Sequence, residues 1–305
     1  MSNDSKIVQT TNMLEYLYKG EVNECVPKDT TNVKFALSVK VIQKGAFECC
    51  RSLTTIEIPS SVEIIKDEAF RWCTSLESIN IPSSVNSIGH LAFHCCKSLK
   101  SIKIPSSVKC IGFGTFAWCT SLTHIDIPSS IETIEYFAFR CCNSLKRITI
   151  PSLIKTIERE TFRGCSSLTN ISIPSLVETI GEYAFQMCLS LTTIDIPPSV
   201  KHIKYNAFSN CTRLQKIYLS KDCNFDAKTF PHGVTLIYDS YQVGTCIALR
   251  ELIKKNRATL RKHHNDKKRN VSSLVIQKFF TDTNDDIFRY VLQYLINNNI
   301  HINEH

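Results

Sequence analysis

The chain has 305 residues, 43% of them hydrophobic, and a formal net charge of +8. Its first residues are polar and no run approaches the roughly eighteen apolar residues of a membrane span, so the sequence predicts neither a secretory signal nor a transmembrane helix. Without a signal peptide, the 15 cysteines are expected to be reduced thiols rather than a disulfide framework. The predicted location is the cytoplasm, with the nucleus and the periphery of the plasma membrane as alternatives.

Residues 1–41 are expected to form an N-terminal cap. The segment from Asn12 to Gly20 is predicted as a short helix closed by glycine. The segment from Val33 to Val41 alternates apolar and polar residues at period two, which indicates a strand. A stacked array of repeats needs a cover on its open end, and this helix and strand are predicted to provide it.

A pattern of 23 residues repeats without insertion through the middle of the chain, and a degenerate ninth copy extends the predicted array over residues 42–240. From Ala69 to Ile88 it reads Ala-Phe-x-x-Cys-x-Ser-Leu-x-x-Ile-x-Ile-Pro-x-Ser-Val-x-x-Ile. A period of this length is typical of a solenoid in which each repeat forms one coil. The phenylalanine recurs in eight copies: Phe47, Phe70, Phe93, Phe116, Phe139, Phe162, Phe185 and Phe208.

Each repeat is predicted to contain a strand, a second short extended edge and a turn. In the first strand Leu53, Ile56 and Ile58 point inward, whereas Thr55 and Glu57 point outward, because side chains alternate along a strand. Equivalent strands are expected to stack in parallel about 4.8 Å apart. The second edge is Ser-Val-x-x-Ile, and Ala-Phe-x-x-Cys is predicted as a turn or a single helical turn that buries its phenylalanine between coils.

The order Ile-Pro-x-Ser-Val-x-x-Ile-x-x-x-Ala-Phe-x-x-Cys-x-x-Leu resembles the BspA-like class of the leucine-rich-repeat family over roughly residues 40–220. The resemblance, with the predicted caps, implies an α+β repeat fold: a right-handed leucine-rich-repeat β-solenoid with a parallel sheet of about eight coils and a C-terminal helical cap. Serine stands where asparagine or cysteine usually forms an internal hydrogen-bond ladder. Members of the class are mostly binding or adhesive proteins, several of them at cell surfaces.

No motif predicts catalysis, a metal or a cofactor. A glycine-rich phosphate loop, a His-Glu-x-x-His motif and a nucleophile elbow are all missing from the sequence. The cysteine doublets at 49–50, 95–96 and 141–142 lack the gap of about two to four residues that lets two thiolates bind one zinc ion. The column Cys50, Cys73, Cys96, Cys119, Cys142, Cys165, Cys188 and Cys211 is therefore predicted to be a packing position in the core.

The outward positions of the long strands are the predicted binding surface, on the concave face of the solenoid. Their side chains vary from coil to coil on a constant scaffold, which suits recognition of another protein. A merely solvated face is the alternative. The predicted contact residues are Lys103, His124, Asp126, Arg147, Thr149, Asn170 and Asp195.

The tripeptide Val33-Lys34-Phe35 resembles the docking motif through which regulators bind type-1 protein phosphatase. Asn32 and Thr31 stand where that motif normally has a basic residue. One class of phosphatase regulators is itself built of leucine-rich repeats. The resemblance implies docking through Val33 and Phe35, whereas a strand that caps the first coil is the alternative.

Residues 241–305 are predicted to form a basic helical cap, with helices at 246–263 and 285–296. Its positive residues fall into two clusters that resemble a bipartite nuclear-import signal, and an anionic lipid surface or nucleic acid would suit them equally. A solvated helix face is the third interpretation. The basic residues are Lys254, Lys255, Arg257, Lys267, Lys268 and Arg269.

The sequence thus predicts a non-enzymatic scaffold that binds another protein through its concave face. The first alternative is a BspA-like surface or adhesion antigen. The second is a regulatory subunit of type-1 protein phosphatase.

Overall fold

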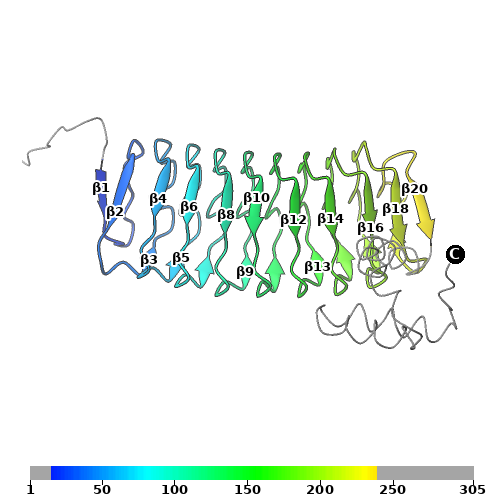
Figure 1. The fold of residues 1–305 in the computed structure, drawn as a ribbon, viewed down its shortest axis with the longest axis horizontal. Helices are drawn as coiled ribbons and strands as arrows, with labels where there is room; N and C mark the ends of the chain where they lie inside the picture. Colours follow the sequence, from blue (N-terminus) through cyan, green and yellow to red (C-terminus); the bar gives the residue numbers. More distant parts are fainter. Residues whose placement is uncertain (1–14, 239–305) are drawn as a thin grey trace, which may run out of the picture. The chain divides into compact units, whose positions relative to one another are not determined.

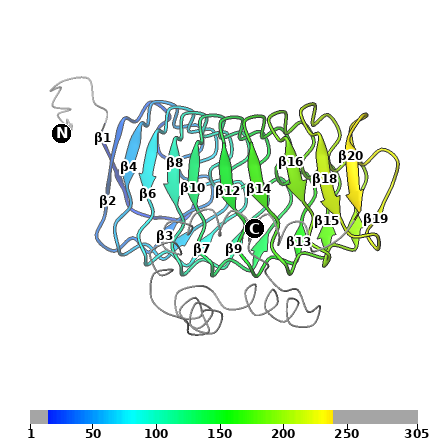
Figure 2. The ribbon, with the colours of Figure 1, turned by 45° about the vertical axis from the view of Figure 1, so that its right-hand side comes forward.

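The computed structural model describes residues 15–238, and within them the chain forms a solenoid of parallel strands. Successive coils lie side by side in chain order, each adding one long and one short strand (Figures 1 and 2). Nine short strands mark about nine coils in this part of the chain. Pairings join equivalent positions of neighbouring coils, such as His124 with Ser101 and Ile125 with Ile102.

The long strands form a row whose outward side we call the long-strand face. In chain order they are β1 (Glu15–Tyr18), β2 (Asn32–Phe35), β4 (Thr55–Glu57), β6 (Ser78–Asn80), β8 (Ser101–Lys103), β10 (His124–Asp126), β12 (Arg147–Thr149), β14 (Asn170–Ser172), β16 (Thr193–Asp195), β18 (Lys216–Leu219) and β20 (Thr235–Tyr238). The middle residue of each three-residue strand is buried and its two neighbours are exposed, as the alternation predicts.

The short strands form a second row along the other edge of each coil (Figure 2). They are β3 (Val41–Ile42), β5 (Ile64–Ile65), β7 (Ser87–Ile88), β9 (Cys110–Ile111), β11 (Thr133–Ile134), β13 (Thr156–Ile157), β15 (Thr179–Ile180), β17 (His202–Ile203) and β19 (Asn224–Phe225). Between the two rows, Ser84, Ser107 and Ser130 bond the preceding coil in place of an asparagine ladder, whereas the equivalent Ser61 and Ser199 hydroxyls have no hydrogen-bond partner within the described residues. Ser84 Oγ donates to the Val62 carbonyl at 2.6 Å, and Ser130 Oγ donates to the Ser106 carbonyl at 2.7 Å.

The Ala-Phe-x-x-Cys segments form a third side of each coil, which we call the turn face. Alternate backbone N–H groups there donate to the next coil, as from Glu68 to His90 and from Trp72 to His94, both at 2.8 Å. Glu68 and Trp72 have φ of +59° and +62°, a left-handed conformation that costs free energy for residues with a side chain. The hydrogen bonds between coils offset that cost in each coil from Gly45 to Met187.

The predicted α+β class is wrong, because residues 15–238 contain no helix. The helix predicted for residues 12–20 is wrong for residues 15–18, which form strand β1 instead. Tyr18 is buried there against Phe47, and its hydroxyl accepts the backbone N–H of Gln43 at 2.9 Å. The predicted strand from Val33 to Val41 is divided between β2 and β3. The predicted C-terminal helical cap is not part of the described fold, since residues 246–263 and 285–296 lie outside the described residues.

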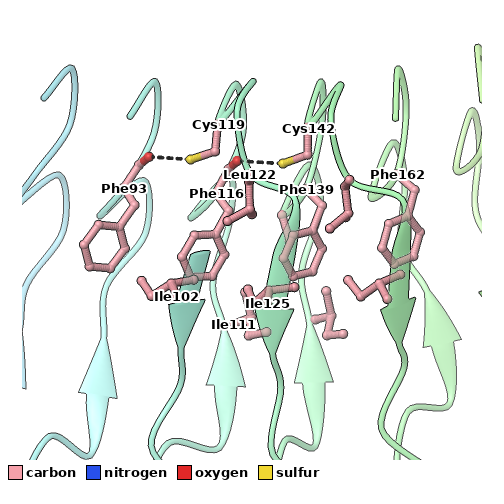
Figure 3. Packing of buried hydrophobic residues seen from close by; sticks show 14 of the residues in the cluster. Phe93, Ile102, Ile111, Phe116, Cys119, Leu122, Ile125, Phe139, Cys142 and Phe162 are labelled. Atoms are coloured by element: carbon pink, nitrogen blue, oxygen red, sulfur yellow. Dashed lines mark hydrogen bonds between the residues drawn. The ribbon is translucent and has the colours of Figure 1, made fainter. Parts of the chain in front are cut away.

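The core is a continuous column of phenylalanine rings. From Phe47 to Phe208 neighbouring ring centroids lie 5.0–5.7 Å apart and the ring planes agree within 15°. Figure 3 shows three of these steps, with Leu122, Ile102 and Ile125 packed around the rings. Because each ring contacts one neighbour on either side, each coil stabilises the next.

The buried cysteines of the repeat form hydrogen bonds between coils in addition to packing in the core. Each thiol from Cys73 to Cys211 donates a hydrogen bond to a phenylalanine carbonyl of the preceding coil, with sulfur–oxygen distances of 3.0–3.2 Å. Figure 3 shows the bonds from Cys119 to Phe93 and from Cys142 to Phe116. Burial raises the pKa of Cys50 and Cys211 to about 12, so these thiols keep the proton that a donor needs. The prediction of a core position did not include this hydrogen bond.

Candidate functional site

The long-strand face presents two rows of outward side chains at fixed spacing. Residues two apart on one strand lie side by side, so each coil contributes one neighbouring pair. On β10 the pair is His124 and Asp126, whose Nε2 and Oδ1 atoms are 2.7 Å apart. The seven residues predicted to contact a partner all lie exposed in these rows: Lys103, His124, Asp126, Arg147, Thr149, Asn170 and Asp195.

A shallow hollow of about 510 Å³ lies over β4, β6, β8 and β10. Its lining includes the charged side chains of Glu57, Lys103 and Asp126 and the imidazole of His124. The other outward residues of these strands are short, which leaves the backbone accessible between the charged groups: Thr55, Ser78, Asn80 and Ser101. The hollow therefore offers both signs of charge together with hydrogen-bond donors and acceptors.

The structure brings only part of the predicted set together. Lys103, His124 and Asp126 line the hollow. The other four predicted residues lie farther along the same face, on β12, β14 and β16, where partial burial raises the pKa of Asp195. Glu57 also lines the hollow, although it was not among the predicted contact residues. The sequence could have identified it, because it lies in the same outward row as Lys103 and Asp126.

Residues 15–238 contain no group of three or more side chains that could hold a metal ion. In that range, no helix is long and apolar enough to cross a membrane. The candidate basic patch of Lys254, Lys255, Arg257, Lys267, Lys268 and Arg269 lies outside the described residues.

The candidate docking tripeptide lies within strand β2. Val33 is only 8% exposed, and the ring of the half-buried Phe35 lies 5.5 Å from that of Tyr18 and 6.1 Å from that of Phe47. Lys34 points outward, with its Nζ 3.0 Å from Glu15 Oε1. A docking motif needs both apolar side chains free for the partner, whereas here they cover the first ring of the phenylalanine column.

Replacing both apolar residues in Val33→Ala/Phe35→Ala is expected to lower the free energy of unfolding by about 2–4 kcal/mol, because both side chains leave a packed cluster. Chemical denaturation measures the change. The control is Leu37→Ala, since Leu37 is 97% exposed and should leave stability unaltered. An unaltered unfolding midpoint for the double variant would show that β2 is not part of the core. It would then favour the interpretation of Val33 and Phe35 as a docking motif.

The row of long strands, the row of short strands and the turn face, all built on one repeat of 23 residues, define a leucine-rich-repeat solenoid. The chain belongs to the family described as the BspA type leucine-rich repeat region, whose six-copy model matches residues 40–166 and 133–232. Together these matches span well over half of the chain. The resemblance seen in the sequence is thereby confirmed.

Two leucine-rich repeat proteins of solved structure are similar to the chain. A leucine-rich repeat protein from Bacteroides ovatus ATCC 8483 is 28% identical, with a TM-score of 0.60, over 70% of this chain and 61% of that one. The T. pallidum leucine-rich repeat protein is also 28% identical, with a TM-score of 0.48, over 67% of this chain and 78% of that one. The chain thus spans less than two thirds of the Bacteroides protein. No curated protein matches the chain significantly.

Proposed function

We propose that this chain is a non-enzymatic scaffold that binds another protein through its long-strand face, with the hollow over β4–β10 at the centre of the contact. The observation that carries the proposal is the contrast between the two sides of the long strands. The inward residue is isoleucine in every three-residue strand, whereas the outward residues include acidic, basic and neutral polar side chains. A constant core with a varied exposed face is what recognition by a repeat scaffold requires.

The backbone supports this function because it holds the contact residues in place before a partner arrives. Hydrogen bonds on the turn face and the column of stacked rings fix each coil against the next. Little backbone freedom then remains to be lost on binding, which favours affinity for a given contact area. The mixed charges in the hollow select a partner with complementary charges.

The double variant Lys103→Glu/Arg147→Glu is expected to abolish capture of the partner without changing thermal stability. Both side chains are exposed near the middle of the row, where truncations and charge changes cost most, and neither contributes to the core. The measurement is affinity capture from native cell extract with quantitative mass spectrometry, alongside a melting curve.

The matched control is Lys155→Glu/Lys201→Glu, which makes the same change in net charge at exposed positions beside the short strands. It should capture the partner as the unmodified chain does. Retained capture by the Lys103/Arg147 variant would refute the proposal, and loss with both variants would indicate a general effect of charge.

The identity of the captured protein separates this proposal from the other two roles considered. A phosphatase catalytic subunit would support the regulatory role, and matrix or host-cell proteins would support an adhesive one. The location of a tagged chain in its own cells provides an independent comparison for the adhesive role.

A further inference from the structure

Large apolar side chains gather on the turn face, on the side of the coil that the proposed binding site does not use. Trp118, Tyr136, Met187 and Tyr205 are each 39–49% exposed. The fold does not require them, because other coils have Asp67 at the position of Tyr136 and Tyr205 and Gly164 at the position of Trp118 and Met187. Tryptophan, tyrosine and arginine are the residues most enriched at the energetic centres of protein interfaces.

Four successive positions at steps of 23 on this face form what we call the corner row: Tyr136, Arg159, Glu182 and Tyr205. Glu182 is half-buried and the other three are exposed. The row has a tyrosine at each end and two opposite charges in the middle. When two such rows lie antiparallel, the arginine of each row therefore faces the glutamate of the other.

The charged centre of the corner row makes contacts within its own chain. Arg159 Nε lies 3.4 Å from Glu160 Oε1, and Arg159 Nη1 lies 3.8 Å from Glu182 Oε2. The guanidinium also sits 5.8 Å from the centre of the Tyr183 ring, which meets Tyr205 edge to face. Glu160 itself is buried beneath its arginine partners. These contacts restrict Arg159 and Tyr205 before any partner binds, which lowers the entropic cost of association.

We propose that the turn face around the corner row is a docking surface for a second copy of this chain in antiparallel orientation. A two-fold axis that crosses the face between Arg159 and Glu182 brings each row onto its own reverse, and both copies have the same coil spacing of about 4.8 Å, so their coils stay in register. Arg159 then faces the partner's Glu182, and Tyr136 faces the partner's Tyr205.

A neighbouring row fits the same axis. Met187, 42% exposed, comes opposite the partner's Gly164, which has no side chain to obstruct it. The dimer leaves both long-strand faces free, because they lie on another side of each coil. It would therefore present two copies of the proposed binding face, and a partner with two sites would be held by both.

The test uses the full chain and two single charge reversals. Sedimentation equilibrium over a range of concentrations should show a monomer–dimer equilibrium for the unmodified chain. Glu182→Arg sets two arginines against each other, and Arg159→Glu sets two glutamates against each other, so each should weaken self-association at least about tenfold. The control Glu132→Arg reverses an exposed charge that pairs with Lys109 beside the short strands, and it should change nothing.

The decisive step is to mix the two weakened variants. In a mixed dimer of this register native Arg159 of one chain faces native Glu182 of the other, and at the second contact the introduced arginine faces the introduced glutamate. Heterodimers should therefore form where neither variant pairs with itself. Native mass spectrometry distinguishes them. A chain that stays monomeric up to its solubility limit overturns the proposal, as does a dimer that neither reversal weakens. Weakened variants that fail to recover on mixing overturn the antiparallel register. The capture experiment on the long-strand face is independent of all these outcomes.

Discussion

Phe116→Ala is expected to lower the free energy of unfolding by about 3–5 kcal/mol, the usual cost of truncating a fully buried phenylalanine. The ring is fully buried, and its centroid lies 5.6 Å from that of Phe93 and 5.7 Å from that of Phe139. Truncation leaves a cavity that both neighbouring coils line. Because coils of a repeat protein contact only their neighbours, the variant should also unfold less cooperatively, with the two halves separating at the mutated coil.

Urea denaturation followed by circular dichroism measures this change, and a broadened or biphasic transition would report the loss of coupling. The control is Asp126→Ala in the adjoining coil, where the side chain is exposed and should alter stability by no more than about 0.5 kcal/mol. Equal effects of the two substitutions would contradict the assignment of inward and outward positions.

Alkaline conditions are expected to unfold the solenoid. Burial raises the pKa of Cys50 and Cys211 to about 12 and that of Cys223 to about 11, and it raises the pKa of Cys96 and Cys142 well above its ordinary value. Thiols of the unfolded chain lose their protons near pH 8.5. Between that pH and about 11 the unfolded chain binds fewer protons than the folded one, so stability falls as pH rises.

The effect is large because many thiols act together. Each contributes about 1.4 kcal/mol for every pH unit above the unfolded pKa, until its folded pKa is reached. Stability measured by urea denaturation at a series of pH values from 7 to 10 should therefore be level at first and then fall steeply. Stability that stays constant across this range would mean that the thiols are not buried as described.

A variant with two fewer thiols isolates the cysteine contribution. Cys119→Ala/Cys142→Ala removes two of the buried donors and should be less stable at pH 7, where two hydrogen bonds between coils are lost. Its stability should nevertheless fall less steeply above pH 9, because two fewer protons distinguish the folded from the unfolded chain. An unchanged slope would assign the alkaline effect to other groups, such as Tyr18, whose pKa burial also raises to about 12.

The repeat allowed much of the fold to be predicted from sequence, because the relevant information is local. Alternation within Leu-x-x-Ile-x-Ile assigns the side of each residue, and the recurrence of Phe116 and its equivalents every 23 residues assigns one coil to each copy. The outward rows that contain Lys103, His124 and Asp126 followed from the same alternation. The secondary-structure prediction was wrong where the repeat stops, as at β1, which was predicted to be a helix.

Only the tertiary structure decided the features that depend on contacts between coils. Tyr18 lies in a strand because its ring and hydroxyl find partners about 25 residues away in sequence, at Phe47 and Gln43, and local helix signals carry no information about them. The hollow depends on which side chains adjoin across coils, since the short Thr55, Ser78 and Ser101 lie on three neighbouring strands. The thiol hydrogen bonds and the corner row likewise arise from stacking, since a side chain's partner in a solenoid lies one full coil away.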